Sequence, residues 1–283
     1  MIKSLPSVLI LICLDLALAA QPYIDVGNVR FVNSPSTGSV GKEKNPTVLN
    51  YVSISTTLPF QFNNKRDAVI LSPFFEEWTS RVSPPDKYDE HHYGLSMPVS
   101  YLKSFIHSKW SVLGTVIGRM NDAVISSQGK YQLGGVVIAG YKKNEKLTYK
   151  FGVYVNGEFF GLFLIPLVGI DWQINDRTNL FGVLPASLTL ERKLSSHFYA
   201  GMVFRTFTNS YHDTGAAYFR VDENQLGIFI DTYLTKNIIL NLEAGHSILR
   251  KIRTGIEHQK VTDLKADDNF YFKVSLAYRL RLR

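Results

Sequence analysis

Much of the chain consists of runs in which apolar residues alternate with polar or small ones, and the C-terminal run is the clearest. Across 272–283 every even-numbered position is apolar, from Phe272 to Leu282, and every odd-numbered position is small or basic, from Lys273 to Arg283. A period of two places each set on its own face of a strand, whereas a helix would mix them around its circumference. The pattern predicts a β-strand with one apolar face.

Runs of this kind recur along the chain and are separated by short segments rich in Asn, Asp, Gly, Ser and Pro, which favour turns. No segment of ten or more residues has a convincing helical period. Alternation and turn signals together predict twelve strands, at 47–57, 67–78, 93–104, 109–121, 130–142, 147–158, 160–173, 178–192, 197–209, 217–233, 236–249 and 269–282.

The length of these runs and the chemistry of their faces favour a membrane barrel over a soluble sandwich. Strands of soluble proteins average about 5–6 residues, whereas a tilted membrane-crossing strand needs roughly 9–11. Aromatic residues such as Tyr149, Trp172 and Tyr278 lie near run ends, as in the two aromatic girdles of outer-membrane barrels. The opposite faces carry charges of both signs, such as Lys150 and Glu191, which suit a polar lumen and would be costly in a sandwich core.

Lipid offers no water to the open edge of a sheet, so strands that cross it must close into a barrel. We therefore predict an all-β fold, an antiparallel up-and-down transmembrane β-barrel of about 12 strands. The segment 159–170 is apolar on both faces, and its length and Pro166 argue against a spanning helix. We expect its inner side to contact a plug or a cluster of lumen side chains.

The first twenty residues have the order of a secretory signal peptide: Lys3, then an apolar core at 8–14, then small residues at 17–20. Asp15 interrupts the apolar part, which leaves a short buried N-terminal helix as the alternative. The predicted organisation is a signal peptide at 1–20, a polar N-terminal segment at 21–45 that is periplasmic or forms a plug, and the outer-membrane barrel at 46–283.

Composition removes several other classes of protein. With 45% hydrophobic, 13% aromatic and 19% charged residues the chain is not disordered, and its 20 glycines have no triplet period. No apolar run reaches the roughly 18 residues of a spanning helix. The one cysteine, Cys13, lies in the predicted signal after Ile12, where lipid attachment requires a small residue. We therefore expect no disulfide and no cysteine site in the mature chain.

Several segments resemble an uncharacterised family of bacterial outer-membrane β-barrels, known only as a domain of unknown function (number 6268). The segments are 151–161, Pro166, Asp171-Trp172, 188–194, 231–237 and 243–250. The resemblance covers roughly residues 45 to 283 and implies the barrel and the outer membrane. It implies no activity. The chain ends in Leu282-Arg283, whereas outer-membrane proteins generally end in an aromatic residue that the assembly machinery reads.

Serine and histidine residues that lie close together in the sequence are candidates for a lipid-hydrolase site. His107-Ser108 and His246-Ser247 are adjacent pairs, and adjacent residues of a strand point to opposite faces, so they cannot act as nucleophile and base. His197 and Ser195 have the better spacing but lie in a predicted turn. We predict no enzyme and no catalytic residue.

His91-His92 beside Asp89 and Glu90 supplies residue types that bind metals, but a metal site needs three or four convergent ligands. This segment is expected to be a solvated polar loop. Gly134-Gly135 lies within a predicted strand, so no nucleotide-binding loop is indicated. We predict no metal site, no cofactor-binding residues and no cofactor.

The chain has 31 Lys+Arg against 24 Asp+Glu, a net charge of +7, and two interpretations of this excess stay open. Basic residues could attract lipopolysaccharide phosphates or small anionic solutes inside a pore. Alternatively, they pair internally with Glu191, Asp231 and Glu243. No basic domain is concentrated enough to indicate nucleic-acid binding. The expected partners are outer-membrane lipids and lipopolysaccharide, the outer-membrane assembly machinery and, if the first interpretation holds, a small anionic solute.

Twelve strands fall between the filled barrels of eight and the water-filled barrels of sixteen. The expected role is therefore a passive narrow channel, a passage for small solutes or lipids, or a structural wall protein, with 21–45 as a candidate plug. The alternatives are an outer-membrane lipid-modifying enzyme, with His197, His246 and Ser247 as its candidates, and a soluble periplasmic ligand-binding β-barrel. Both termini should face the periplasm, yet this strand count places the long linkers 79–92 and 250–268 at opposite ends.

Overall fold

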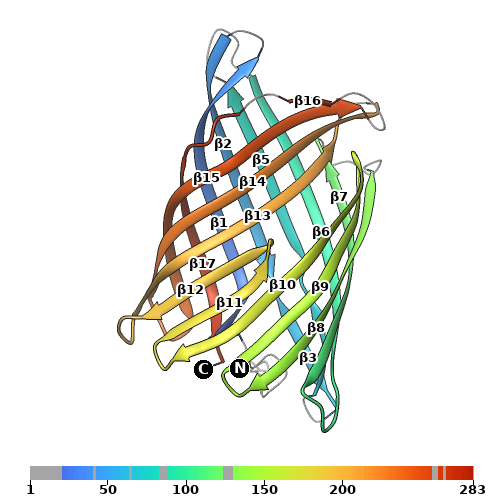
Figure 1. Cartoon of the computed structure of the whole chain (residues 1–283). Coiled ribbons are helices and arrows are strands. Elements are labelled where there is room, and N and C mark those ends of the chain that lie inside the picture. The colour runs from blue at the N-terminus through green and yellow to red at the C-terminus, as the bar shows by residue number, and fades with distance from the viewer. Residues whose placement is uncertain are drawn as a thin grey trace, which may run out of the picture.

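The computed structural model describes residues 21–40, 43–63, 66–82, 88–123, 130–213, 215–256, 261–263 and 266–282. In this part of the chain fourteen strands pair antiparallel in a closed ring (Figure 1). In ring order they are β1 (Tyr23–Val40), β2 (Glu43–Thr56), β5 (Phe74–Val82), β6 (Tyr88–Ser104), β7 (Trp110–Asp122), β8 (Tyr131–Asn144), β9 (Leu147–Glu158), β10 (Gly161–Asn175), β11 (Thr178–Leu184), β12 (Ser187–Lys193), β13 (Phe198–His212), β14 (Ala217–Tyr233), β15 (Ile238–Ile256) and β17 (Phe270–Arg281). Pairing of β17 with β1 closes the ring.

Three further strands lie outside the ring. β3 (Leu58–Phe62) and β4 (Asp67–Leu71) form a hairpin that prolongs β2 and β5 at one end, and β4 pairs with β6. β16 (Val261–Asp263) pairs with the last part of β15 at the other end.

The prediction of about 12 strands was therefore too low by two, for two separate reasons. Residues 21–45 were expected as a periplasmic segment or plug, but Tyr23–Val40 forms a wall strand, β1. The predicted strand 178–192 is the hairpin of β11 and β12 with its turn at 185–186. Even-numbered residues pair across this hairpin, as Gly182 does with Leu188, so one unbroken alternation runs through the turn. The predicted signal at 1–20 lies outside the described residues.

Both chain ends lie at the same end of the barrel, which we call the terminal end (Figure 1). Five of the connections there are short, at 105–109, 145–146, 176–177, 194–197 and 234–237, and the connection from β2 to β5 contains the hairpin of β3 and β4. Once 178–192 is counted as two strands, the segments 79–92 and 250–268 both fall at the end of the barrel opposite the termini. Short turns at the end with the termini and longer loops at the other are typical of outer-membrane barrels.

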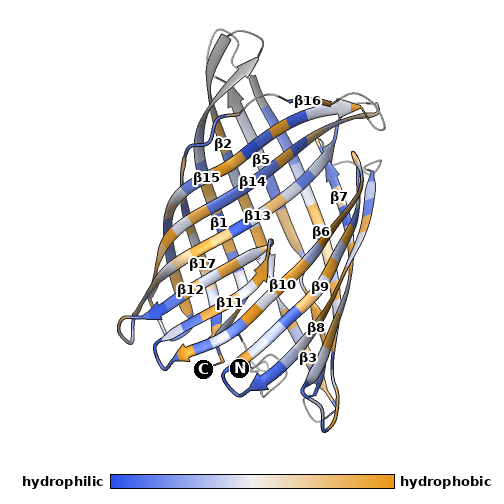
Figure 2. Ribbon diagram, viewed as in Figure 1, coloured by the Kyte–Doolittle hydropathy of each residue, from blue (hydrophilic) through white to orange (hydrophobic). Residues whose placement is uncertain are grey.

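Hydrophobic and hydrophilic residues alternate along the strands (Figure 2). Many large apolar side chains are exposed on the outer face, and many polar ones are buried inside. On β17, Phe272 and Tyr278 are about half exposed on the outer face, while Lys273 and Arg279 are buried on the inner face. The described residues contain no helix that is long and apolar enough to cross a membrane.

Candidate functional site

Ion pairs cross the lumen near the terminal end. Arg279 of β17 binds Asp25 of β1 through its Nε (2.5 Å) and Asp231 of β14 through its Nη1 (2.6 Å). The Arg281 guanidinium donates two hydrogen bonds to the carboxylate of Glu191 of β12, at 2.6 and 2.9 Å. These contacts tie four strands of the ring together across its interior.

A second cluster surrounds Glu243 of β15. Its carboxylate accepts hydrogen bonds from Arg205 (2.5 and 2.9 Å) and from the Tyr271 hydroxyl (2.7 Å), and the Lys273 ammonium lies 2.5 Å away. An unpaired charge buried to this degree would cost several kcal/mol. Of the two interpretations of the basic residues, internal pairing with Glu191, Asp231 and Glu243 is confirmed for Arg281, Arg279 and Arg205.

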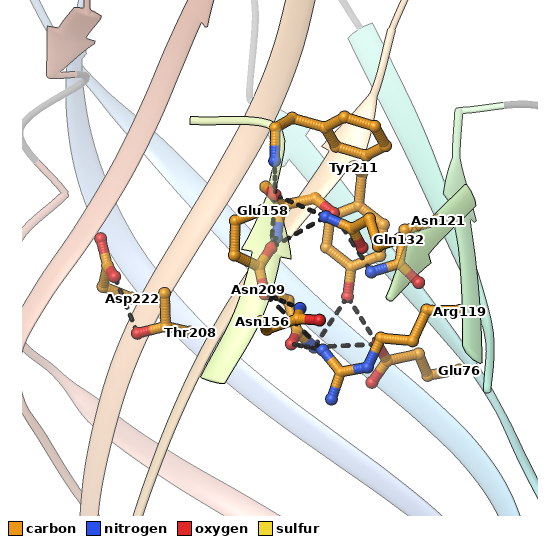
Figure 3. Close-up of polar contacts among 12 residues, drawn as sticks. Glu76, Arg119, Asn121, Gln132, Asn156, Glu158, Thr208, Asn209, Tyr211 and Asp222 are labelled. Carbon is orange, nitrogen blue, oxygen red and sulfur yellow. Dashed lines mark hydrogen bonds and ion pairs between the residues drawn. The ribbon is translucent and has the colours of Figure 1, made fainter. Parts of the chain in front are cut away.

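Two carboxylates are held further from the terminal end, and polar side chains between them join both into one network (Figure 3). Glu76 of β5 accepts hydrogen bonds from Asn209 (2.9 Å) and Tyr211 (2.8 Å) of β13, and from Tyr51 of β2 (3.0 Å). Glu158 of β9 accepts from residues of β8 and β13. β13 therefore reaches across to the inner face of β8 and β9 in this part of the barrel.

One more buried pair joins Arg250 of β15 to Glu223 of β14, at 2.6 and 2.8 Å, and the same guanidinium contacts Ser34 of β1. Together these clusters fill much of the lumen with charged and polar side chains. The structure is thus a narrow barrel whose inside is largely occupied, rather than a wide water-filled pore.

A cavity of about 400 Å³ remains toward the terminal end, and we call it the terminal chamber. It is lined by Gln21, Tyr23, Ile24, Asp25, Asn28, Arg30, Ser55, Thr57, Pro59, Ile70, Ser72, Ser100, Leu113 and Phe181. Its walls are partly polar and partly apolar. Such a mixed lining suits a small ligand that has both kinds of surface.

A smaller cavity of about 110 Å³, the central cavity, lies against the ion pairs around Arg279 and Glu243. Four residues of β1 line both cavities: Tyr23, Asp25, Asn28 and Arg30. The two cavities are therefore neighbours along the lumen, separated by side chains of one strand. The sequence placed 21–45 in the lumen only as a candidate plug, and did not predict that these residues line cavities from a wall strand.

The wall itself is discontinuous between β10 and β13, where β11 and β12 are only seven residues each (Figure 1). β10 pairs with β11 only from Val168 onward, and β13 pairs with β12 only up to Arg205. In the described part of the chain, residues 161–167 therefore pair with β9 alone, and 207–211 with β14 alone. We call this stretch, in which each of the two strands pairs with another strand on one side only, the seam.

The seam combines an apolar edge with a polar one. On β10, the inward Phe163 contacts Tyr154 and Phe160, while Leu162 is 76% exposed on the outer face. The prediction that 159–170 is apolar on both faces of a strand is confirmed for β10, and its inner side meets aromatic lumen neighbours. On β13, Thr208 donates a hydrogen bond to Asp222 of β14 (2.9 Å) (Figure 3).

His91 and His92 lie on β6, so the prediction of a loop at this position was wrong. β6 begins at Tyr88, five residues before the predicted start, because these polar residues continue the strand beyond its apolar part. His91 is exposed and contacts Glu77 (2.8 Å), while His92 is buried and stacks on Phe219 at 4.1 Å between ring centroids. The described residues contain no group of three side chains placed to hold a metal ion.

The serine and histidine candidates do not form a nucleophile and base with an orienting acid in the described part of the chain. His197 lies in the turn 194–197, as predicted, with its Nδ1 2.9 Å from the hydroxyl of its neighbour Ser196. The Ser195 hydroxyl instead accepts hydrogen bonds from two backbone N–H groups of this turn. The His246 Nδ1 contacts the backbone oxygen of Ser247, whose hydroxyl donates to the backbone oxygen of Asn269.

Comparison with known proteins gives a family and a set of structures. The family model described as "Domain of unknown function (DUF6268)" matches residues 85–283. No match is found among curated proteins. A FadL homologue from Pseudomonas aeruginosa has a TM-score of 0.52 at 12% identity, over 93% of this chain and 92% of that one. An outer membrane channel from Pseudomonas putida F1 has a TM-score of 0.51 at 9% identity, over 90% and 94%. At these identities the likeness is one of fold.

Proposed function

The chain belongs to the family Domain of unknown function (DUF6268), and we propose that it forms a narrow channel for small solutes in the outer membrane. The observation that carries the proposal is the pair of neighbouring cavities along the lumen, about 400 and 110 Å³, inside a ring of fourteen strands. A ring filled only to hold its wall together would not need a chamber of that size. The two structures of similar fold described above, an outer membrane channel and a FadL homologue, support the same role.

The ion-pair clusters define what kind of channel this would be. Glu243 and its partners stand beside the central cavity, so a solute must pass closely spaced charges instead of bulk water. We therefore expect a small conductance that depends on the charge of the solute, since rings of fixed charge control selectivity at close quarters.

The two alternatives have weaker support. A lipid-modifying enzyme would have to use His197, His246 or Ser247, whose hydrogen bonds serve a turn and a strand end. A soluble ligand-binding barrel would expose its outer face to water, yet Leu133 is 70% and Leu164 is 60% exposed there. Contiguous exposed apolar surface of this kind fits lipid.

The test is conductance in a planar lipid bilayer, using the mature protein purified in detergent and potassium chloride as electrolyte. We expect small single-channel steps in the wild type. We expect larger steps in the double variant Glu243→Gln/Arg205→Gln, which replaces both charged side chains of the central ion pair. Lys146→Gln, in the turn at 145–146, is the matched control and should leave the steps unchanged. A heat-modifiable, folded barrel that gives no steps with any of these variants would refute the channel.

The outer-membrane location and the lipid and assembly partners belong to the same proposal. We expect the protein in the outer-membrane fraction, migrating differently on a detergent gel before and after boiling. Recovery in the soluble fraction without such a shift would instead support the soluble barrel.

A further inference from the structure

We propose that the terminal chamber binds a small organic carboxylate with an apolar body, and that Arg30 is the residue that binds its carboxylate group. This inference rests on the proposed channel, for which it names the class of solute. It starts from an arginine whose surroundings differ from those of the other lumen cations.

The charged side chains around the central cavity do not balance. They are Arg30, Arg205, Lys273, Arg279, Asp25, Asp231 and Glu243. Four are cations and three are anions. Arg205 and Lys273 share Glu243, and Arg279 holds both aspartates. The one positive charge left over is that of Arg30.

Arg30 makes no hydrogen bond or ion pair with any carboxylate of the described residues. Its Nε is buried without a partner, and so is the Oδ1 of Asn28, two positions away on the same inward face of β1. The next carboxylate along the lumen, Glu76, is held by Tyr51 and by two side chains of β13. A buried donor without an acceptor is costly, and a guanidinium fits a carboxylate through two parallel hydrogen bonds.

Arg30 lines both cavities, so a carboxylate bound to it lies at their border. The rest of the terminal chamber offers that ligand an apolar wall, from Ile70 of β4, Leu113 of β7 and Phe181 of β11. Ser55 of β2 adds a hydroxyl near the polar end. A cation is disfavoured by the surplus positive charge, and one free guanidinium matches a single carboxylate better than a multiply charged anion.

The test is equilibrium binding of benzoate to the purified, folded barrel, with benzamide as the uncharged probe of the same shape. We expect benzoate to bind and benzamide not to displace it. Arg30→Gln should weaken benzoate binding at least tenfold, about 1.4 kcal/mol. Arg30→Lys keeps the charge but loses the paired geometry, so its loss should be smaller. Arg177→Gln, in the turn at 176–177, makes the same change outside the lumen and should bind like the wild type.

Conductance of the same preparations separates this inference from the channel proposal. A wild type that conducts potassium chloride without binding benzoate, or binds it equally well after Arg30→Gln, overturns the carboxylate site and leaves the channel. A wild type that binds benzoate through Arg30 without conducting overturns the channel and leaves the site. Displacement of benzoate by benzamide at equal concentration would show that the chamber recognises only the ring, and would also overturn the inference. If Arg30→Gln does not fold, Arg30→Lys and the benzamide competition decide.

Discussion

The two sides of the barrel wall are built differently. Where the ring closes, β1 pairs with β2 from Gly27–Thr56 to Val40–Glu43, and with β17 over ten residue pairs. On the other side, β11 and β12 pair over only six residue pairs, and the longer strands beside them pair on one side only at the seam. One side is held by long ladders, whereas the other is interrupted partway along the wall.

The side chains follow the same division. The closing strands β15 and β17 supply most of the buried ion pairs, including those of Arg250, Lys273 and Arg279. At the seam the inward residues of β10 are apolar, and β13 changes on its outer face from Phe204 to Thr206 at the level where β12 ends. The buried ion pairs that hold the wall together therefore lie mainly on the side where the first and last strands of the ring pair.

The largest expected effect comes from removing an ion pair where β17 closes the ring on β1, which we call the closing side. Arg279→Ala would leave Asp25 and Asp231 without their cation, and Asp231 is almost completely buried. We expect a loss of about 3–5 kcal/mol in the free energy of unfolding, because a single buried charge remains uncompensated. The measurement is the urea midpoint of the heat-modifiable gel shift, with Arg177→Ala as the exposed control. A midpoint equal to that of the control would mean that the lumen ion pairs do not hold the ring.

A substitution on β13, where it pairs with β12, should cost less. A Cβ added at Gly201 of β13 would lie 2.0 Å from the backbone oxygen of Leu190, whereas one added at Gly114 of β7 meets nothing within 4 Å. We expect Gly201→Ala to destabilise the barrel by about 1–3 kcal/mol through overpacking. Gly114→Ala should leave the urea midpoint nearly unchanged. Equal midpoints for both variants would show that the strands beside the seam separate without strain.

Hydrogen exchange compares the two sides directly in the wild type. Backbone amides at 161–167 and 207–211 have one neighbouring strand, whereas those at 27–33 have two. We expect the seam peptides to exchange at least tenfold faster, since local opening there breaks fewer hydrogen bonds. Mass spectrometry of the protein in lipid nanodiscs measures this. Uniform protection around the ring would contradict the division.

The smallest effect is expected at a single hydrogen bond beside the seam. Thr208→Val removes the hydroxyl that binds Asp222, but Asp222 keeps its contacts with Arg220 and Arg253. We expect a loss of about 0.5–1.5 kcal/mol, the usual net value of one such bond. A urea midpoint lowered as much as by Arg279→Ala would show that the seam, not the closing side, limits stability.

The alternation of side chains predicted the barrel and its apolar outside, and the internal pairing of Glu191, Asp231 and Glu243 was one of two interpretations of the basic residues. The barrel and its apolar outside follow from a period of two, which can be seen within each strand separately. The pairing of the carboxylates follows from the cost of leaving a buried charge unpaired. The hairpin of β11 and β12 was missed because even-numbered residues face outward both before and after its turn. The alternation therefore continues through the turn and does not show where one strand ends and the next begins.

β1 was missed for a different reason, and the binding site we propose was missed with it. The register shift between Asp25 and Gly27 moves the inward set of residues from Tyr23 and Asp25 to Asn28 and Arg30. Odd positions therefore face inward before the shift and even positions after it, and the period is lost. That Arg30 has no carboxylate partner depends on contacts among strands far apart in the chain, which no local pattern contains.

The bond between Arg279 and Asp25 joins residues 254 positions apart, the two ends of the ring. A contact of such long range has a large loop-closure cost and can form only when nearly the whole chain is present. During assembly the edge of β1 that pairs with β17 must therefore stay unpaired until β17 is present. It follows that a chain shortened at either end would retain most of its hairpins and still lose the closed barrel, because both free edges would face lipid.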